Sequence, residues 1–254
     1  IRKEFMDAGY KVANNFKDTL FEVCDYGIPQ HRKRVIIIGV RMDYFDKGKN
    51  VSDDMIHDFY KVIMPTLRTE QKTVDEAIGD LPKIFPLPDP VVINGKKYSH
   101  APISSDKVKN HIPRFHSARD ISVFRMLEED IETGRNEYVK IDKLKELYTK
   151  VTGKVSNIHK YYVLRNNEPS NTIPAHLYKD GNQFIHPDYT QGRSITVREA
   201  ARLQSFPDDF IFEGSRTEQF KQIGNAVPPL LAEAIAKAFR AYLSAPIEEE
   251  KNDI

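Results

Sequence analysis

The stretch RSITVREAARLQSFPD at residues 193–208, followed by GNAVPP at residues 224–229, decides how this chain is organised. Its Thr-Val-Arg-Glu motif at residues 196–199 is a capping box, in which the threonine and glutamate side chains each accept a free backbone N–H of the first helical turn. The helix that it opens is expected to end before Pro207, because proline disfavours helical geometry in the preceding residue. A second capping box, Ser-Arg-Thr-Glu at residues 215–218, predicts a helix that runs to the glycine of the second stretch.

The polar pair Gly224-Asn225 is predicted to form a loop between two helices that face a core. A loop of this kind can bring backbone N–H groups and an asparagine side chain to a ligand. A third helix is predicted to begin at the prolines that follow the pair. Its core face is given by residues at helical spacing, namely Leu231, Ile235, Ala238 and Tyr242.

A second decisive stretch, DYGIPQHRKRVIIIGV at residues 25–40, lies near the start of the chain. Its unbroken, β-branched run at residues 35–40 predicts a strand that is buried on both faces of an α/β sheet. Gln30, Arg32 and Arg34 come just before this strand, so at least one cation is expected at the edge of the sheet. Taken alone, such charges could simply solvate the end of a strand.

Residues 25–35, with their Gln-x-Arg-x-Arg core, are similar to the eighth conserved block of DNA (cytosine-5) methyltransferases. Residues 193–208 resemble the ninth block of that family, and residues 224–228 resemble the tenth. The three segments keep the family's order, with a long variable insert between the eighth and the ninth. The resemblance implies an α/β fold, namely the C-terminal portion of a Rossmann-like methyltransferase catalytic domain with an inserted α+β target recognition domain.

This resemblance implies four divisions of the chain: residues 1–41 as the end of the catalytic α/β domain, 42–191 as the target recognition domain, 192–245 as the return to the cofactor side of the catalytic domain, and 246–254 as an acidic tail. Within the insert, local patterns predict a helix capped by Thr73, a hairpin around Asn94-Gly95, helices at residues 120–134 and 141–148, a strand at 161–164 and a second hairpin at 177–185.

The resemblance also assigns roles to single residues. In the eighth block, Arg34 is expected to contact the oxygen of a flipped cytosine, with Gln30 and Arg32 as orienting or backbone-contacting partners. Arginine suits this task because its planar donor fork is always charged and holds its geometry better than lysine. Thr172, in a proline-rich turn of the recognition domain, is expected to lie near the extruded base.

The resemblance further implies S-adenosylmethionine as the cofactor. Phe206 corresponds to an aromatic residue that packs against it, and Asn225 and Val227 correspond to residues that line the same pocket. Taken singly, Phe206 could be an ordinary core residue and Asn225 an ordinary helix cap. Their place in ordered blocks favours the ligand interpretation.

Residues 93–119 are locally basic, within a chain whose formal net charge is +1. We predict that Lys96, Lys107 and Arg114 contact the phosphates of double-stranded DNA. On composition alone, a solvated basic loop is about as probable. Two histidines of this segment have a spacing compatible with metal ligands, but no cysteine pair or carboxylate cluster accompanies them, so no metal is expected.

The bulk composition is that of an ordinary folded protein, with 254 residues, of which 40% are hydrophobic and 30% charged. The single cysteine, Cys24, excludes an internal disulfide and suits a cytoplasmic protein. No apolar run approaches the ~20 residues that cross a bilayer, so no contact with a membrane is expected.

Methyl transfer to C5 of cytosine requires a cysteine thiolate that adds to C6 of the base. The family supplies it from a Pro-Cys loop, together with a Glu-Asn-Val stretch and a glycine-rich cofactor loop. None of these occurs in the sequence, and Cys24 is interpreted as a small buried residue. We therefore expect a C-terminal fragment that is inactive alone and needs a missing N-terminal catalytic half, on the same parent chain or on a separate subunit. The alternative is a non-catalytic DNA-binding module.

Overall fold

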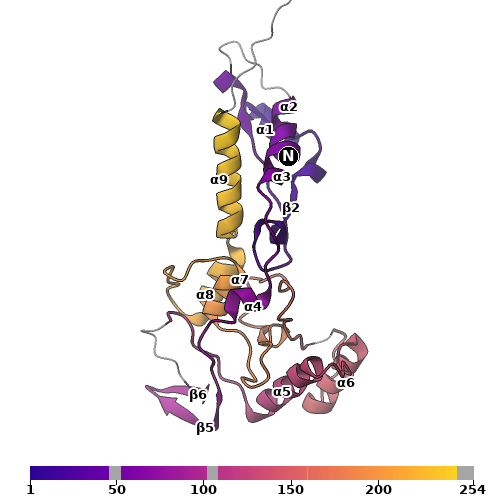
Figure 1. Cartoon of the computed structure of the whole chain (residues 1–254), viewed down its shortest axis with the longest axis vertical. Coiled ribbons are helices and arrows are strands. Elements are labelled where there is room, and N and C mark those ends of the chain that lie inside the picture. The colour runs from indigo at the N-terminus through magenta and orange to yellow at the C-terminus, as the bar shows by residue number, and fades with distance from the viewer. Residues whose placement is uncertain (46–52, 102–107, 159, 245–254) are drawn as a thin grey trace, which may run out of the picture.

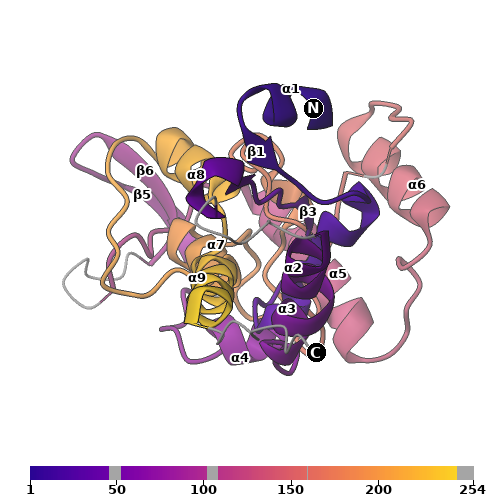
Figure 2. The same ribbon diagram turned by 90° about the horizontal axis from the view of Figure 1, so that it is seen from above.

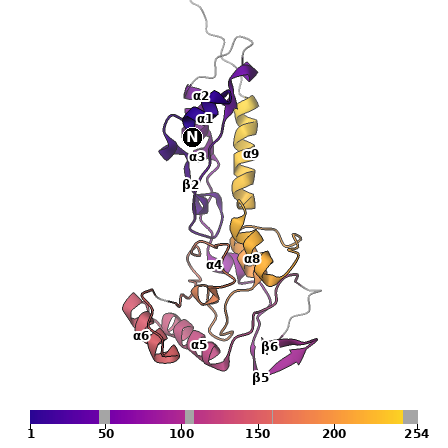
Figure 3. The same ribbon diagram turned by 180° about the vertical axis from the view of Figure 1, so that it is seen from behind.

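The computed structural model describes residues 1–45, 53–101, 108–158 and 160–244. It shows an elongated molecule with two parts (Figure 1). One part is built on the long helix α9 (Pro229–Ser244), which runs beside the N-terminal segments. The other gathers the middle of the chain around helices α7 (Val197–Leu203) and α8 (Arg216–Asn225). Figure 3 shows the same division from behind.

The other helices are α1 (Arg2–Asp7), α2 (Asp53–Asp58), α3 (Met64–Thr66), α4 (Val74–Ile78), α5 (Ala118–Glu132) and α6 (Ile141–Thr152). A π-helical segment, η4 (Phe59–Ile63), joins α2 to α3, and 3-10 turns occur at η1 (Phe16–Thr19), η2 (Val23–Tyr26), η3 (Met42–Phe45) and η5 (Gly181–Gln183). In the described ranges, no helix is both long enough and apolar enough to cross a membrane.

The strands of the described residues form three antiparallel pairs: β1 (Tyr10–Lys11) with β4 (Val40–Arg41), β2 (Leu20–Glu22) with β3 (Lys33–Val35), and β5 (Pro86–Ile93) with β6 (Lys96–His100). The β5–β6 hairpin and helix α6 lie at opposite ends of the second part, as Figures 1 and 2 both show.

Local signals in the sequence predict the helix starts correctly. The capping boxes at Thr73 and Thr196 both form, each with its reciprocal pair of hydrogen bonds. At Ser215 only half of the predicted box is found in the described residues: the Ser215 side chain accepts the backbone N–H of Glu218 (3.4 Å), while the Glu218 carboxylate accepts from Lys221 instead. Helix α8 still begins at the next residue. Asn94 and Gly95 have φ values of 50° and 73°, as the type I′ turn predicted between β5 and β6 requires.

The predicted buried strand at residues 35–40 is wrong. Only its ends pair, in β3 and β4, and Val35 is 55% exposed. Between them, the Tyr60 hydroxyl donates to the carbonyl oxygen of Ile36 (3.0 Å) and accepts the N–H of Ile38 (2.9 Å). A side chain thus satisfies backbone groups that a neighbouring strand would otherwise pair, and no described strand pairs with the middle of the run.

Two predictions in the middle of the chain are also wrong. Residues 161–164 form only an isolated bridge, and residues 177–185 form turns and the 3-10 helix η5 instead of a hairpin. Leu164, Leu177 and Phe184 are all buried in one core. The apolar residues of these segments therefore indicate that the segments are buried, but not that they pair as strands.

Gly224 and Asn225 form the last turn of α8 and not the predicted loop. A Cβ atom on Gly224 would lie 2.2 Å from the backbone nitrogen of Ala175 and 2.3 Å from the carbonyl carbon of Pro174. Glycine is therefore required by the close approach of another backbone segment, while its own conformation is helical.

Two hydrophobic cores correspond to the two parts. In the first, α9 packs against residues of the 21–38 segment and of the α2–α3 region. On its predicted face, Leu231 and Ala238 are buried and Ile235 is partly buried, whereas the side chain of Tyr242 lies outside the described part. In the second core, α7 and α8 pack against α4 and the segments around residues 164–184. A smaller cluster holds α5 and α6.

Candidate functional site

Gln30 is the centre of a buried set of polar contacts between segments that are far apart in the sequence. Its side-chain amide donates to the carbonyl oxygen of Leu203 (3.1 Å) and to the side-chain oxygen of Gln204. Its own side-chain oxygen accepts the backbone N–H of Ile173 (2.9 Å). Gln204 in turn donates to two carbonyl oxygens around the end of α8, at 3.0 Å each. One glutamine thus ties the segment before β3 to α7 and to the turn at residue 173.

Arg32 completes these contacts and is only 3% exposed. One terminal nitrogen donates to the carbonyl oxygen of Ile173 (2.8 Å), and the other donates to that of Gly224 (2.9 Å). Burial, and then the neighbouring charge of Arg34, lower its pKa to about 10. These five residues are called the polar junction below: Gln30, Arg32, Ile173, Gln204 and Gly224.

Residues 170–173 cross the chain just before β3 and hold it in place. The backbone N–H of His31 donates to the carbonyl oxygen of Ser170 (2.7 Å), and that of Ser170 donates to Pro29 (2.9 Å). The Thr172 hydroxyl donates to the carbonyl oxygen of His31 (2.6 Å). The structure thus brings Thr172 beside the segment of Gln30 and Arg32.

Other predicted site residues are exposed next to this junction. The guanidinium of Arg34 makes one hydrogen bond within the described residues, to the carbonyl oxygen of Lys33 (2.7 Å), and no carboxylate there pairs with it. Asn225 is exposed, and Val227 is 53% exposed. These three residues are called the exposed rim below: Arg34, Asn225 and Val227.

Phe206 is half-buried in the turn that follows α7. Its ring centroid lies 5.0 Å from those of both Phe210 and Phe212. Ser205, with a left-handed φ of 66°, accepts the backbone N–H of Leu230 (3.2 Å) and so joins this turn to the start of α9. The three predicted cofactor residues therefore come from adjoining segments and offer an aromatic ring, an amide and an aliphatic side chain.

The basic residues predicted to bind DNA are placed less closely together. Lys96 is exposed on β6, and Arg114 is half-buried, with its pKa lowered by burial. Their segments adjoin, because the backbone N–H of His116 donates to the Ser99 hydroxyl (2.9 Å). Lys107 lies outside the described residues.

Arg216, at the start of α8, was missed by the sequence analysis. Its side chain is exposed, yet partial desolvation by the surrounding protein, and then the positive charge of Arg114, lower its pKa, so the two cations are neighbours. No carboxylate forms an ion pair with either of them within the ranges that the structure covers. Because they lie 102 positions apart in the chain, no local signal could have paired them.

The segment that resembles the ninth block is anchored by a buried ion pair. Arg193 donates to both carboxylate oxygens of Glu199, at 2.8 and 2.7 Å, and both side chains are 1% exposed. Burial opposes the ionisation of Glu199, but the Arg193 guanidinium holds the pKa of that carboxyl well below its usual range. Glu199 also accepts the backbone N–H of Thr196 and so closes the capping box. The start of α7 is therefore fixed from inside the core.

Cys24 is 1% exposed, which confirms its interpretation as a buried residue. Burial, and then the negative charges of Glu22 and Asp25, raise the pKa of its thiol to about 11. The thiol is therefore protonated at neutral pH. This is the opposite of the environment that activates a cysteine nucleophile.

The chain matches the family model of C-5 cytosine-specific DNA methylases over residues 1–241. It is 31% identical over 262 residues to the type II methyltransferase M.Bpa9945I of Bacillus paralicheniformis, and this match covers 96% of this chain and 56% of that protein. It is 33% identical over 259 residues to the type II methyltransferase M.DdeI of Desulfomicrobium norvegicum, and this match covers 95% of this chain and 57% of that protein. The chain thus spans little more than half the length of these relatives.

A solved structure shares this fold. It is a protein encoded within an E. coli prophage and described as a DNA modification methyltransferase, with a TM-score of 0.51 and 25% identity over 94% of this chain and 62% of that one. The class that the fold and the matched segments define is that of DNA methyltransferases with mixed helices and strands. Within this class, the chain belongs to the C-5 cytosine-specific DNA methylase family.

Proposed function

We propose that this chain is the C-terminal portion of a DNA (cytosine-5) methyltransferase, which recognises a specific duplex site and helps to hold a flipped cytosine for methyl transfer from S-adenosylmethionine. The observation that carries this proposal is the polar junction. It joins the segments that resemble the eighth, ninth and tenth blocks and leaves Arg34 exposed at their edge. Taking a base out of the stack costs on the order of a few kcal/mol, so the enzyme needs groups that hold the extruded base.

Arg34 is the residue that we assign to the base. No carboxylate of the described residues neutralises its guanidinium, so most of its donors are available to an oxygen of the cytosine ring. Gln30 and Arg32 are assigned as positioning residues. The Gln30 amide and the two terminal nitrogens of Arg32 already donate to backbone and glutamine oxygens, so the two residues act by fixing the segment that carries Arg34.

Phe206, Asn225 and Val227 are assigned to the cofactor. S-adenosylmethionine, when bound, supplies the methyl group. The three residues fit such a ligand, because a half-buried aromatic ring can pack against a flat ring system, while an exposed amide and an aliphatic side chain offer polar and apolar contacts.

Lys96, Lys107 and Arg114 are assigned to DNA phosphates, and Thr172 to the surroundings of the extruded base. The neighbouring charges of Arg114 and Arg216 support the first assignment. Reversing the charge of the three predicted residues together should reduce the slope of log K against log salt by roughly 0.9 for each phosphate that the protein no longer neutralises. An unchanged slope would remove these residues from the interface.

The divisions at residues 41 and 191 are proposed as functional boundaries between catalytic and recognition parts. They are not packing boundaries, because buried residues from both sides of residue 191 share one core. The same holds at residue 41, since residues 56–64 pack with residues 21–38 and with α9.

We expect the chain to transfer no methyl group by itself, because it contains no Pro-Cys loop and holds its only cysteine protonated. The test is incorporation of radiolabelled methyl groups into unmethylated DNA, by the chain alone and with the N-terminal half encoded at the same locus. Recovered methylation supports the proposal, whether that half belongs to one parent chain or to a separate subunit. DNA binding without recovery would favour a non-catalytic DNA-binding module, and turnover by the chain alone would refute its inactivity.

In the reconstituted enzyme, Arg34→Ala should lower the rate of methyl transfer by roughly 100-fold or more, because a charged donor at the reacting base is lost. The matched control is Arg41→Ala. Arg41 is also exposed, but it is already paired with Asp43 (3.0 Å). Its replacement should leave the rate within about twofold of the parent enzyme.

A further inference from the structure

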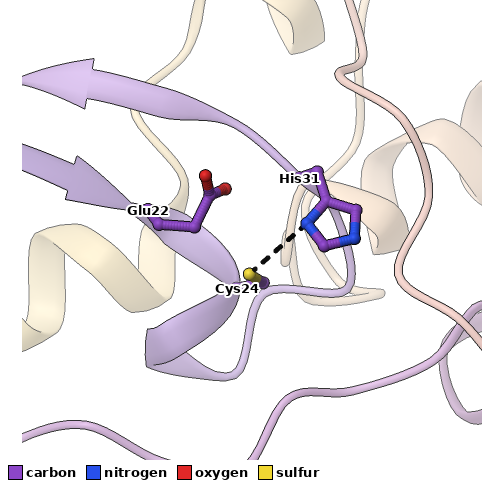
Figure 4. Close-up of side chains that lie close together, drawn as sticks. All are labelled: Glu22, Cys24 and His31. Atoms are coloured by element: carbon purple, nitrogen blue, oxygen red, sulfur yellow. Dashed lines mark hydrogen bonds between the residues drawn. The ribbon is translucent and has the colours of Figure 1, made fainter.

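Three potential metal ligands meet on the N-terminal side of the polar junction. Glu22 ends β2, and Cys24 lies in the following 3-10 turn, which ends at Gly27. His31 lies beyond this turn, and Figure 4 shows the three side chains together. One ligand atom of each lies within 4.8 Å of the other two. The Sγ atom of Cys24 is 3.7 Å from Nδ1 of His31.

This spacing is that of two ligands on one metal ion. Zinc binds sulfur at about 2.3 Å and imidazole nitrogen at about 2.0–2.1 Å. At a tetrahedral angle, these bond lengths separate the sulfur and the nitrogen by about 3.6 Å. The observed 3.7 Å therefore needs almost no adjustment of the Cys24–His31 pair.

The backbone around the three residues is fixed before any ion arrives. The N–H of Val23 donates to the carbonyl oxygen of Arg32 (2.9 Å), and Glu22 pairs with Lys33 in the β2–β3 ladder. One carboxylate oxygen of Glu22 accepts the backbone N–H of Arg32 (2.7 Å), which orients the carboxylate. Ligands held on such a scaffold lose little freedom on binding.

The site also has an entry path and a suitable balance of charge. His31 is exposed and Glu22 is half-buried, whereas Cys24 forms the inner wall. A thiolate, a carboxylate and a neutral imidazole carry two negative charges, which a divalent ion cancels. The combination of sulfur and imidazole ligands favours zinc-like ions over magnesium or calcium.

We propose that Glu22, Cys24 and His31 bind a divalent ion of the zinc class, with a fourth position open to water. On binding, the Cys24 thiol releases its proton to solvent and a metal–sulfur bond forms, without oxidation or reduction. The histidines of the basic segment predicted no metal, whereas Glu22, Cys24 and His31 are brought together by a turn of the folded chain. The ion would clamp the two strands that flank Gln30 and Arg32, and this inference does not depend on methyl transfer.

The test uses Co²⁺ as a spectroscopic substitute for Zn²⁺, with the reduced, tag-free chain. We expect one Co²⁺ ion to bind per chain and to give a thiolate-to-cobalt charge-transfer band, which Zn²⁺ then removes by displacement. Because Cys24 is the only cysteine, such a band reports this residue alone. Absence of the band at saturating Co²⁺ overturns the proposal.

Variants show whether the three ligands act together. Cys24→Ser should abolish the band, and His31→Gln and Glu22→Gln should each weaken Co²⁺ binding at least tenfold. His31 is exposed, so its replacement leaves the fold in place, which circular dichroism can verify. The matched control is His176→Gln, at an exposed histidine 3.4 Å from Asp180, which should leave the affinity unchanged. Unchanged affinity in both His31→Gln and Glu22→Gln would reveal a lone thiolate and reject the three-ligand site.

Discussion

Arg32 and Arg34 are two arginines of one motif, and they have opposite environments. Arg32 is 3% exposed, and its guanidinium is held by two backbone carbonyl oxygens. Arg34 is exposed, and its single hydrogen bond in the described chain is to the adjacent residue. The difference arises because the segment at residues 170–173 crosses the chain before β3 and covers only the first arginine.

The comparison distinguishes residues that hold the site in place, such as Arg32, from residues that are free to bind a ligand, such as Arg34. The polar junction uses its donors within the protein, so its loss should appear first as lost stability. The exposed rim has donors to spare, so its loss should leave stability unchanged and affect only a ligand. Substitutions in the polar junction should therefore lower the free energy of unfolding more than substitutions in the exposed rim.

The largest effect is expected at Gly224, in the polar junction. In Gly224→Ala the new Cβ would lie 2.2 Å from the nitrogen of Ala175, which is backbone and cannot rotate away. We expect the free energy of unfolding to fall by at least about 3 kcal/mol, as in severe overpacking. Urea denaturation monitored by circular dichroism measures it.

Gly39→Ala is the matched control for Gly224→Ala. The atoms nearest to its Cβ would be ring atoms of Tyr10 and Phe5, at 3.3 and 3.4 Å, and not backbone. Its effect should stay within about 1 kcal/mol in either direction, since alanine also restricts the unfolded chain. Equal midpoints for Gly224→Ala and the parent chain would show that the backbone contact at Ala175 is absent in solution.

The next effect is expected for Arg32→Met, which keeps the length of the side chain but removes its donors. The carbonyl oxygens of Ile173 and Gly224 would then be buried without partners, at about 1–3 kcal/mol each. Removing a buried cation returns part of this cost, so we expect a net loss of about 2–4 kcal/mol in the free energy of unfolding. Urea denaturation measures it, with the exposed Arg41→Met as control. A loss below that of the control would contradict a structural role for Arg32.

The pH dependence of stability should come from the second part of the molecule, because the polar junction has no group that titrates between pH 5 and 8. Burial, and then the charge of Arg114, lower the pKa of His116 to about 3. Below pH 6.5, the ordinary pKa of histidine, this side chain is protonated only in the unfolded state. The free energy of unfolding therefore falls as the pH is lowered. In His116→Gln, the slope of unfolding free energy against pH should decrease by about 1.2 kcal/mol per unit between pH 6 and 5.

Urea denaturation at pH 6 and 5 gives this slope for the parent chain and for His116→Gln. Glutamine keeps an acceptor for the backbone N–H of Ser194, which His116 accepts at 3.1 Å. His176→Gln, at an exposed histidine, should keep the slope of the parent chain. If the two variants have the same slope, His116 is protonated in the folded state and is not buried as the structure has it.

Signals that act within one helical turn or one β-turn were sufficient to predict parts of the fold. The capping boxes at Thr73 and Thr196 and the turn at Asn94-Gly95 all form as predicted. The chemistry of each is contained in four or fewer neighbouring residues, so the rest of the chain has little power to override it.

Contacts between distant segments could not be predicted in the same way. The apolar run at residues 35–40 indicated burial, but the Ile36 carbonyl and the Ile38 N–H in its middle pair with the hydroxyl of Tyr60, which no periodicity reveals. The motif likewise indicated two functional arginines without showing which one is buried. The partners of Arg32 lie 141 and 192 positions away, so only the folded chain distinguishes it from Arg34.

The smallest effect on stability is expected at Arg34, in the exposed rim. In Arg34→Ala, one exposed hydrogen bond to the carbonyl oxygen of Lys33 is lost and no buried group is left unpaired. The free energy of unfolding should therefore change by less than about 0.5 kcal/mol. Urea denaturation beside Arg32→Met provides the direct comparison. A loss above about 1 kcal/mol would make Arg34 a second structural arginine and remove the reason for assigning its donors to a base.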